Sequence, residues 1–210
     1  FAMWKDVEST LLDYLNVKYV VAPPLANMPD PERWSLVYHG RDGRLFANRD
    51  VLPRFFAVEN VILEFQKPKY AHRLASHTDW KNTAILDALK VENDRMRTDY
   101  LAPRPPGSPR AHVTITHASP TEYRMRVTAP RWSLVVSSIP WWPGWKVARA
   151  GVSHDPIRVN HAFFGFAVPP GVTEVRVWYS PWSYWAGVWV AMATLVVLIG
   201  IGVRRTRVRN

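Results

Sequence analysis

The chain has 210 residues, of which 48% are hydrophobic and 21% charged, and this composition excludes a wholly disordered chain and a wholly membrane-embedded one. It contains no cysteine, which excludes disulfide frameworks, thiolate metal sites and cysteine nucleophiles. Its formal charge of +10 is compatible with nucleic acid, an anionic membrane surface or an acidic substrate, so the position of the charges must decide.

Residues 1–101 are predicted to form an α+β unit. Leucines at helical spacing follow a Ser-Thr cap, and a β-branched stretch after them is stopped by prolines. Asp42-Gly43 lies between two strand-like stretches, where glycine tolerates the positive φ of a tight hairpin turn. The elements expected here are a helix within 7–16, a strand within 17–24, a hairpin around Asp42-Gly43, strand structure over 54–65 and a helix over 79–93.

A proline-rich linker is predicted to separate this unit from an all-β part. The segment 102–110, "APRPPGSPR", holds four prolines and favours extended backbone. Residues 111–180 then contain many short strand-like stretches with breaks at Pro, Gly or Asn, which is typical of an antiparallel β-sandwich. So small a sandwich is marginal alone, and we expect it to dock on residues 1–101.

The carboxyl-terminal part is predicted to be a transmembrane helix over 185–203, with an aromatic entry from residue 181. No charged residue occurs between Val177 and Val203, and this run is long enough to cross the hydrocarbon core of a bilayer. Anchoring side chains are expected at both ends, namely Trp182, Tyr184, Trp185 and Trp189 at the start and Arg204, Arg205, Arg207 and Arg209 in the tail 204–210.

The arginines predict the orientation of this helix. Basic residues next to a span stay in the cytoplasm, so the tail is expected inside and residues 1–180 outside. The amino terminus, "FAMWKDVEST", lacks the charged and apolar regions of a signal peptide. We therefore expect further transmembrane helices before Phe1, with this chain as the carboxyl-terminal part of a multi-pass membrane protein.

The sequence predicts no catalytic constellation, no cofactor and no metal site. His72 and His77, and likewise His112 and His117, are five residues apart, a spacing that brings neither pair together on a helix or a strand. The carboxylates of 87–99 are expected on a solvated helix face. Lys and Arg are scattered rather than gathered in a stripe, so nucleic acid is not an expected partner.

An aromatic cluster lies in the stretch "SIPWWPGWKVARAG". Trp141 and Trp142 are neighbours and point in opposite directions on a strand, so at most one of them shares a surface with Trp145. Core and turn packing around Pro143-Gly144 is the leading interpretation. Contact with the membrane surface or with a glycan stays open for Trp141, Trp142, Trp145, Lys146 and Arg149.

The stretch 141–181 resembles the carboxyl-terminal region of the YfhO family of bacterial multi-pass membrane proteins. That family shows a Tyr-Tyr-Pro-Gly-Trp motif, an Asp-Gly, an Asn before an aromatic strand, a Pro-x-Gly turn and a Tyr-x-Pro before the last helix. The stretches 11–23 and 45–58 resemble the family too, whereas Asn16 and Ala150 stand where Gly and Asp are usual. The matching residues are Pro143, Gly144, Trp145, Gly151, Asn160, Phe164, Pro170, Gly171, Tyr179 and Pro181.

The resemblance implies an architecture similar to membrane glycosyltransferases in the bacterial inner membrane. It places a polyprenyl-phosphate sugar donor and a cell-envelope acceptor among the partners, beside the lipid bilayer and the upstream helices. It also places the catalytic carboxylate before Phe1, so this chain would be an extracytoplasmic cap without catalytic activity of its own. A non-catalytic glycan-binding module and a structural or assembly domain are the alternatives.

Overall fold

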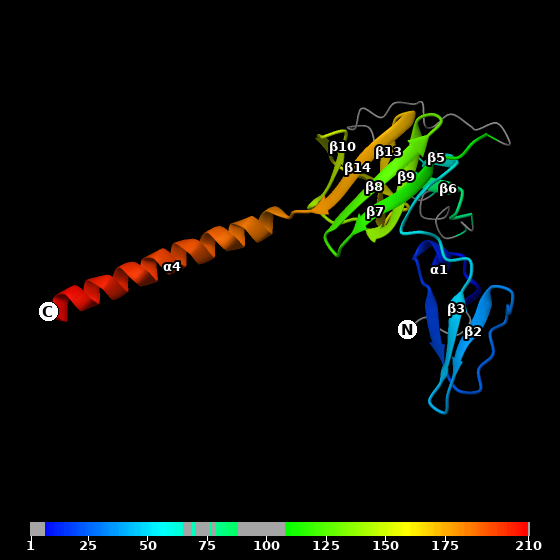
Figure 1. The fold of residues 1–210 in the computed structure, drawn as a ribbon, viewed down its shortest axis with the longest axis horizontal. Coiled ribbons are helices and arrows are strands. Elements are labelled where there is room, and N and C mark those ends of the chain that lie inside the picture. The colour runs from blue at the N-terminus through cyan, green and yellow to red at the C-terminus, as the bar shows by residue number, and fades with distance from the viewer. Residues whose placement is uncertain (1–6, 65–68, 70–75, 77–78, 88–107, 210) are drawn as a thin grey trace.

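The computed structural model of the protein describes residues 7–64, 69, 76, 79–87 and 108–209. Their main secondary structure is β-strand, arranged chiefly in antiparallel sheets, and one long helix is the last element, as the sequence predicts. Figure 1 shows three parts: a three-stranded sheet near the amino terminus, a two-sheet sandwich in the middle, and the helix α4, which projects away from the sandwich.

A β-sandwich of a five-stranded and a four-stranded sheet forms the centre of the molecule, with strand orders β11-β10-β14-β8-β7 and β12-β13-β9-β4. The predicted strands after the linker are confirmed, and β11 is an additional one. The bounds are β4 Phe55–Ala57, β7 His112–Ala118, β8 Glu122–Ala129, β9 Ser133–Pro140, β10 Trp145–Arg149, β11 Val152–His154, β12 Ile157–Val159, β13 Phe163–Val168 and β14 Gly171–Tyr179.

The core of the sandwich follows from the alternation of side chains along its strands. In β8 the residues Tyr123, Met125 and Val127 are buried and the residues between them face outward, as the period of two predicts. Strand β9 instead buries both faces, with Val135 in the core between the sheets and Val136 in a second core. The four-stranded sheet is therefore an inner layer.

The amino-terminal half contributes this further layer and one strand of the sandwich itself. Strand β4 pairs with β9, so the sandwich includes residues that precede the predicted linker. Of the linker itself, residues 108–110 are described, and they form neither helix nor strand. Strands β5 (Asn60–Glu64) and β6 (Thr83–Asp87) form a parallel pair, and residues of both pack into the second core.

The helix predicted over 79–93 is wrong for residues 79–87, because 79–82 form a turn and 83–87 form β6. Residues 88–93 lie outside the described residues. The physical reason is burial. Ala84, Ile85 and Leu86 are all fully buried, and a continuous apolar run has no period that separates a buried parallel strand from a buried helix.

A small three-stranded sheet, in the order β1-β3-β2, extends from the other end of the molecule. It consists of β1 (Tyr19–Ala22), β2 (Trp34–His39) and β3 (Arg44–Asn48), and the short helix α1 (Leu11–Tyr14) precedes it. The predicted hairpin at Asp42-Gly43 is confirmed, although Gly43 does not adopt a positive φ. Its role is steric, because a Cβ there would lie 2.9 Å from the carbonyl oxygen of Ala22.

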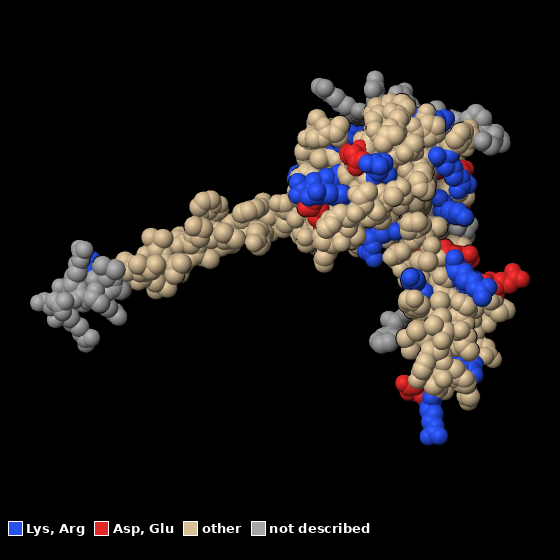
Figure 2. Space-filling model, in the orientation of Figure 1, with Lys and Arg blue, Asp and Glu red and all other residues tan. Residues whose placement is uncertain are grey.

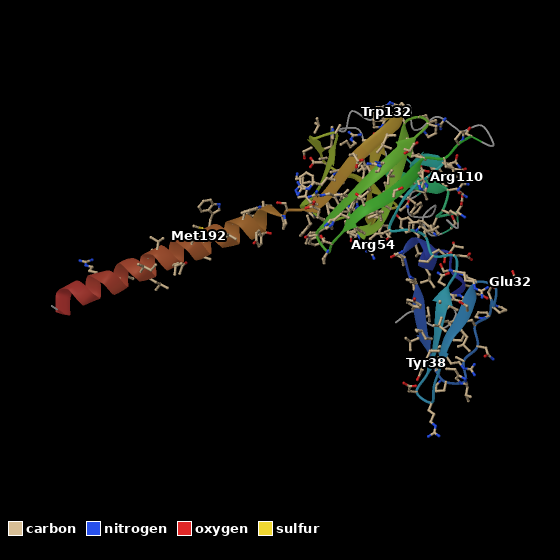
Figure 3. The ribbon with its side chains drawn as sticks, in the orientation of Figure 1. Glu32, Tyr38, Arg54, Arg110, Trp132 and Met192 are labelled. Atoms are coloured by element: carbon tan, nitrogen blue, oxygen red, sulfur yellow. The ribbon has the colours of Figure 1, made fainter. Side chains whose placement is uncertain are left out.

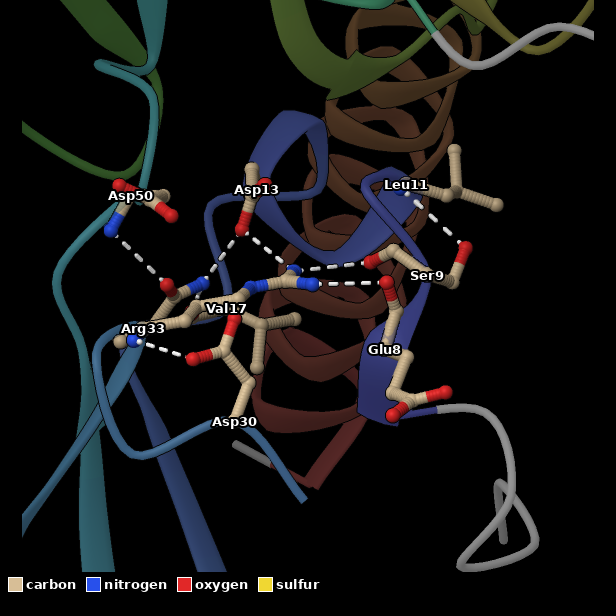
Figure 4. A network of polar contacts seen from close by, with 9 residues as sticks. Glu8, Ser9, Leu11, Asp13, Val17, Asp30, Arg33 and Asp50 are labelled. Atoms are coloured by element: carbon tan, nitrogen blue, oxygen red, sulfur yellow. Dashed lines mark hydrogen bonds and ion pairs between the residues drawn. The ribbon is translucent and has the colours of Figure 1, made fainter. Parts of the chain in front are cut away.

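A buried ion pair joins α1 to this sheet (Figure 4). Nη2 of Arg33 lies 2.7 Å from Oδ1 of Asp13, and the same guanidinium group donates to the carbonyl oxygens of Glu8 and Ser9. The side-chain amide of Asn48 donates to the same Asp13 oxygen at 2.7 Å. These hydrogen bonds to both partners offset much of the penalty of burying the charge pair, and Nε of Arg33 is the guanidinium donor that has no partner among the described residues.

Tyr14 connects α1 to the sandwich. Its side chain is fully buried among the rings of Phe56, Trp80 and Phe163, with the ring centroids 4.8–5.9 Å apart. Its hydroxyl group donates a hydrogen bond of 2.9 Å to the carbonyl oxygen of Ser137 in β9. The amino-terminal unit is therefore docked on the sandwich by both packing and a buried hydrogen bond.

We predict that Tyr14→Ala lowers the free energy of unfolding by about 3–5 kcal/mol, because it leaves a cavity at this junction. Tyr14→Phe keeps the ring but removes the hydroxyl group that donates to Ser137, and should cost about 1 kcal/mol. Urea unfolding of residues 1–210 in detergent, followed by circular dichroism, measures both. The control is Tyr38→Ala on the exposed hairpin (Figure 3), and an equal loss in Tyr14→Ala and Tyr38→Ala would contradict the docking role.

Candidate functional site

The helix α4 (Trp182–Arg209) is exposed along its whole apolar segment. Residues Trp182–Ile201 are long and apolar enough to cross a membrane, and none of that segment is buried against the rest of the described chain. Figure 2 shows no charged atoms along it, and Met192 lies midway, away from the sheets (Figure 3). A helix that is apolar all round and uncovered is typical of a membrane span rather than of the core of a soluble domain.

The helix is joined to the sandwich by a link of two residues, Ser180 and Pro181. The backbone N–H of Ser180 donates to the carbonyl oxygen of Gly144 at 2.8 Å, and the indole N–H of Trp185 donates to the Ser180 hydroxyl group at 3.3 Å. Gly144 has φ 115°, and a Cβ there would lie 2.9 Å from Cα of Pro181. Only glycine lets this turn pack so closely on the link.

The predicted anchoring residues lie at the two ends of α4. Trp182, Tyr184, Trp185 and Trp189 are all exposed around its start, as rings in a headgroup layer would be. Arg204 is exposed at the far end, and the side chains of Arg205, Arg207 and Arg209 lie outside the described residues.

The three tryptophans before the link have three different environments. Trp145 is buried, with its ring centroid 5.3 Å from that of Phe164, and belongs to the core of the sandwich. Trp141 is half-buried, and the guanidinium carbon of Arg158 lies 5.2 Å from its ring centroid. Trp142 is 65% exposed in the turn next to Pro181. The three rings therefore form no continuous flat surface. Core packing is confirmed for Trp145, and of the three rings only that of Trp142 is exposed enough for contact with another molecule.

Of the two cations predicted to contact phosphate or glycan, only Lys146 lies near the start of the helix. Lys146 is opposite Trp178 and forms an exposed ion pair of 2.8 Å with Asp155. Arg149 is opposite Val175, three residues and about 10 Å further from the link than Lys146. Its guanidinium group donates to the carbonyl oxygen of Ala167, so the structure does not bring it to the base of the helix.

A pair of arginines that sequence reasoning missed lies on the outer face of the five-stranded sheet. Arg124 and Arg176 are directly opposite each other on β8 and β14, and both donate to the carboxylate of Glu122. The hydrogen bond from Arg176, and then that from Arg124, lowers the pKa of Glu122 to about 2. The alternation of polar and apolar residues in 122–129 predicts that Arg124 lies on the solvent-exposed face of its strand. Its position opposite Arg176 depends on the register between β8 and β14, which this alternation does not give.

The prediction that His112 and His117 lie on opposite faces of a strand is wrong. A bulge between Ile115 and His117 reverses the alternation, so His112 and His117 share one face, opposite Thr128 and Arg124. Thr128 and Arg124 are four residues apart on β8, which separates the two histidines opposite them by about 13 Å, too far for both to bind one metal ion. Among the described residues no three His, Asp or Glu side chains could hold a metal ion, and His72, His77 and the side chains of 87–99 lie outside them.

A cleft of about 540 Å³ separates the loop after β3 from the residues before β6. Two of its three carboxylates, those of Asp13 and Asp79, stabilise the fold. Asp13 is paired with Arg33, and Asp79 accepts hydrogen bonds from the side chains of Asn82 and Thr83 at 2.8 and 2.9 Å. The lining residues are Thr10, Asp13, Arg49, Asp50, Val51, Leu52, Pro53, Asp79, Trp80, Lys81 and Asn82.

Several positions of the YfhO-like pattern have backbone conformations that explain them without a ligand. Gly144, Gly151 and Gly171 have φ between 83° and 115°, which favours glycine. Asn160 and Asn16, at φ 46° and 60°, use the left-handed region that asparagine tolerates best among residues with a side chain. Ala150, which stands where the family pattern has Asp, has φ 47°. Alanine tolerates this left-handed conformation less well than aspartate does, so the turn is strained.

Comparisons with protein-family models, with curated proteins and with solved structures gave no match to this chain. The YfhO resemblance therefore rests on the motif residues themselves, and its functional implications are proposals.

We predict that Gly144→Ala disturbs the position of α4 relative to the sandwich, because the new Cβ would press on Pro181. Gly171→Ala is the matched control, since Gly171 also has a positive φ but a Cβ there meets nothing within 4 Å. The measurement is the spin-label distance between Thr128→Cys and Thr194→Cys in nanodiscs. Gly144→Ala should shift or broaden the distribution and Gly171→Ala should not, and an equal effect of both would show that only backbone strain matters.

Proposed function

We propose that this chain is the extracytoplasmic cap and last membrane anchor of a bacterial inner-membrane protein that moves sugar from a polyprenyl-phosphate donor to a cell-envelope acceptor. The observation that carries the proposal is the uncovered apolar helix, joined to a β-sandwich by a link of two residues. Such a link keeps the sandwich at the membrane surface, where the phosphate and sugar of a lipid-linked donor lie.

The orientation in this proposal follows from the charges that flank the helix. The exposed aromatic rings precede it and four arginines follow it, so the sandwich is outside and the tail inside. A polyprenyl-phosphate sugar carries its prenyl chain in the bilayer and its sugar in the aqueous layer above. A cap next to the helix would help to position the acceptor against that sugar.

The carboxylates next to the helix are poorly suited to be the catalytic base of such a transfer. A general base works best when its pKa lies near the operating pH, whereas the hydrogen bonds from Arg176 and Arg124 lower the pKa of Glu122 to about 2. Asp155 is exposed and paired with Lys146. This supports the placement of the catalytic carboxylate upstream of Phe1, as the resemblance implies.

A structural or assembly domain is the second candidate, and one observation favours it. Tyr19 and Val21 on β1 lie on one face of the three-stranded sheet with Leu45 and Tyr38, and most of these apolar side chains are exposed. Such an apolar face is common at protein–protein contacts. A glycan-binding module is less well supported, because the tryptophans form no shared surface.

We predict that a membrane-impermeant maleimide labels Ser153→Cys in intact cells but labels Thr206→Cys only after permeabilisation. The chain lacks cysteine, so each variant carries a single thiol, and Ser153 is exposed on β11. Labelling of position 206 in intact cells would reverse the orientation and contradict the proposal.

We also predict that residues 1–210 in nanodiscs transfer no sugar from a radiolabelled polyprenyl-phosphate donor to cell-envelope acceptors. The same assay on the protein with its upstream helices should show transfer. Transfer by residues 1–210 that a single carboxylate substitution abolishes would place the active site in this chain. No transfer by the longer protein would favour the assembly domain.

A further inference from the structure

We propose that Arg124 and Arg176 bind the phosphate group of anionic phospholipids in the outer leaflet, next to the base of α4. The inference rests on the proposed function only in requiring that α4 spans the bilayer and that the sandwich lies outside. It does not depend on sugar transfer.

The two guanidinium groups carry more positive charge than the one carboxylate that pairs with them in the described part of the chain can balance. Like charges directly opposite each other on a sheet repel, and here the carboxylate of Glu122 holds both arginines in place. Two cations and one anion leave a net charge of +1. This matches the single negative charge of a phosphodiester headgroup.

Both arginines also keep hydrogen-bond donors for a ligand. Arg176 donates to Glu122 through Nε and Nη2, and Arg124 through Nε only. In the described part of the chain no other group accepts a hydrogen bond from either side chain, and these side chains are 50% and 61% exposed. The remaining N–H groups form the planar fork that suits phosphate oxygens.

Neighbouring side chains hold the site toward the helix. Arg176 lies 5.0 Å from the ring centroid of Trp178, and both guanidinium groups reach toward Glu122, which is opposite Trp178. The cross-strand pair of Glu122 and Trp178 is two residues closer to the link than the pair of Arg124 and Arg176. Figure 2 shows blue atoms gathered on the sandwich beside the start of α4.

The distance to the bilayer is within reach of lipid headgroups and their field. Trp178 precedes Trp182 by four residues, or about 13 Å if the chain is extended. The headgroup layer is about 5–8 Å thick per leaflet, and the field of anionic lipids extends about 8 Å beyond it. The close packing of Gly144 on Pro181 and the hydrogen bond from Ser180 to Gly144 favour one position of the site relative to α4.

Arg126 is the matched residue for a test. It is on the same strand and face as Arg124, with the same exposed fraction of 61%, but about 7 Å further from the membrane. It is paired one to one with Glu174 at 2.7 Å, so this second pair is neutral. Diffuse attraction of a basic surface would involve all three arginines, whereas a defined site involves only two.

The experiment is native mass spectrometry of residues 1–210 released from vesicles of equal phosphatidylglycerol and phosphatidylcholine. We expect the chain to retain phosphatidylglycerol preferentially, and Arg124→Gln with Arg176→Gln to lower the bound ratio of the two lipids at least fivefold. Arg126→Gln should leave the ratio unchanged. Arg124→Lys with Arg176→Lys keeps the charge without the fork and should give an intermediate ratio.

Three outcomes would overturn the proposal. An equal loss in Arg126→Gln would show diffuse attraction, and displacement of phosphatidylglycerol by millimolar inorganic phosphate would identify free phosphate as the ligand. Preferential retention of polyprenyl phosphate over phosphatidylglycerol in a mixed vesicle would identify the donor lipid instead. Circular dichroism confirms that the variants fold, and maleimide labelling in the same vesicles reports separately whether α4 spans them.

Discussion

The packing of Pro181 on Gly144 determines where every surface of the sandwich lies relative to the helix. With only Ser180 and Pro181 between β14 and α4, and with Ser180 hydrogen-bonded to Gly144, the link has little freedom to bend. If α4 spans a bilayer, the depth of Trp142 is fixed by this contact. A longer or looser link would leave no residue of the sandwich at a defined distance from the lipid.

A fixed link is useful only if the body to which it is attached is rigid, and the amino-terminal half provides that rigidity. The four-stranded sheet is buried on both faces, with β5 and β6 covering the side that faces away from β14. Asn160 connects these layers through two hydrogen bonds to Ile85. Its side-chain oxygen accepts from the backbone N–H of Ile85 at 2.7 Å, and its backbone N–H donates to the carbonyl oxygen of Ile85. A sandwich of residues 111–180 alone would lose both contacts, and small domains have little stability to spare.

The sequence predicts the features that depend on local pattern, and it does not predict those that depend on pairing. Alternation in 122–129 and the uncharged run before Arg204 indicate a half-buried strand and a lipid-facing helix, because each pattern reports the surroundings of its own segment. Strand β6 was missed because burial on all sides erases the period. The bulge next to His117 reverses the faces that simple counting gives, and the contact of Arg124 with Arg176 follows from a register that no single segment encodes.

The pairing of charges explains why a strongly basic chain need not attach to membranes all over its surface. Lys146 with Asp155, and Arg126 with Glu174, are neutral pairs in solvent, where an ion pair contributes little and attracts little. Among these described ion pairs on the outer face of the five-stranded sheet, the one in which two arginines share a carboxylate keeps a net positive charge. Charge left over in one place, with directed hydrogen-bond donors, favours recognition of a single headgroup. The total of +10 alone would favour only unspecific attraction.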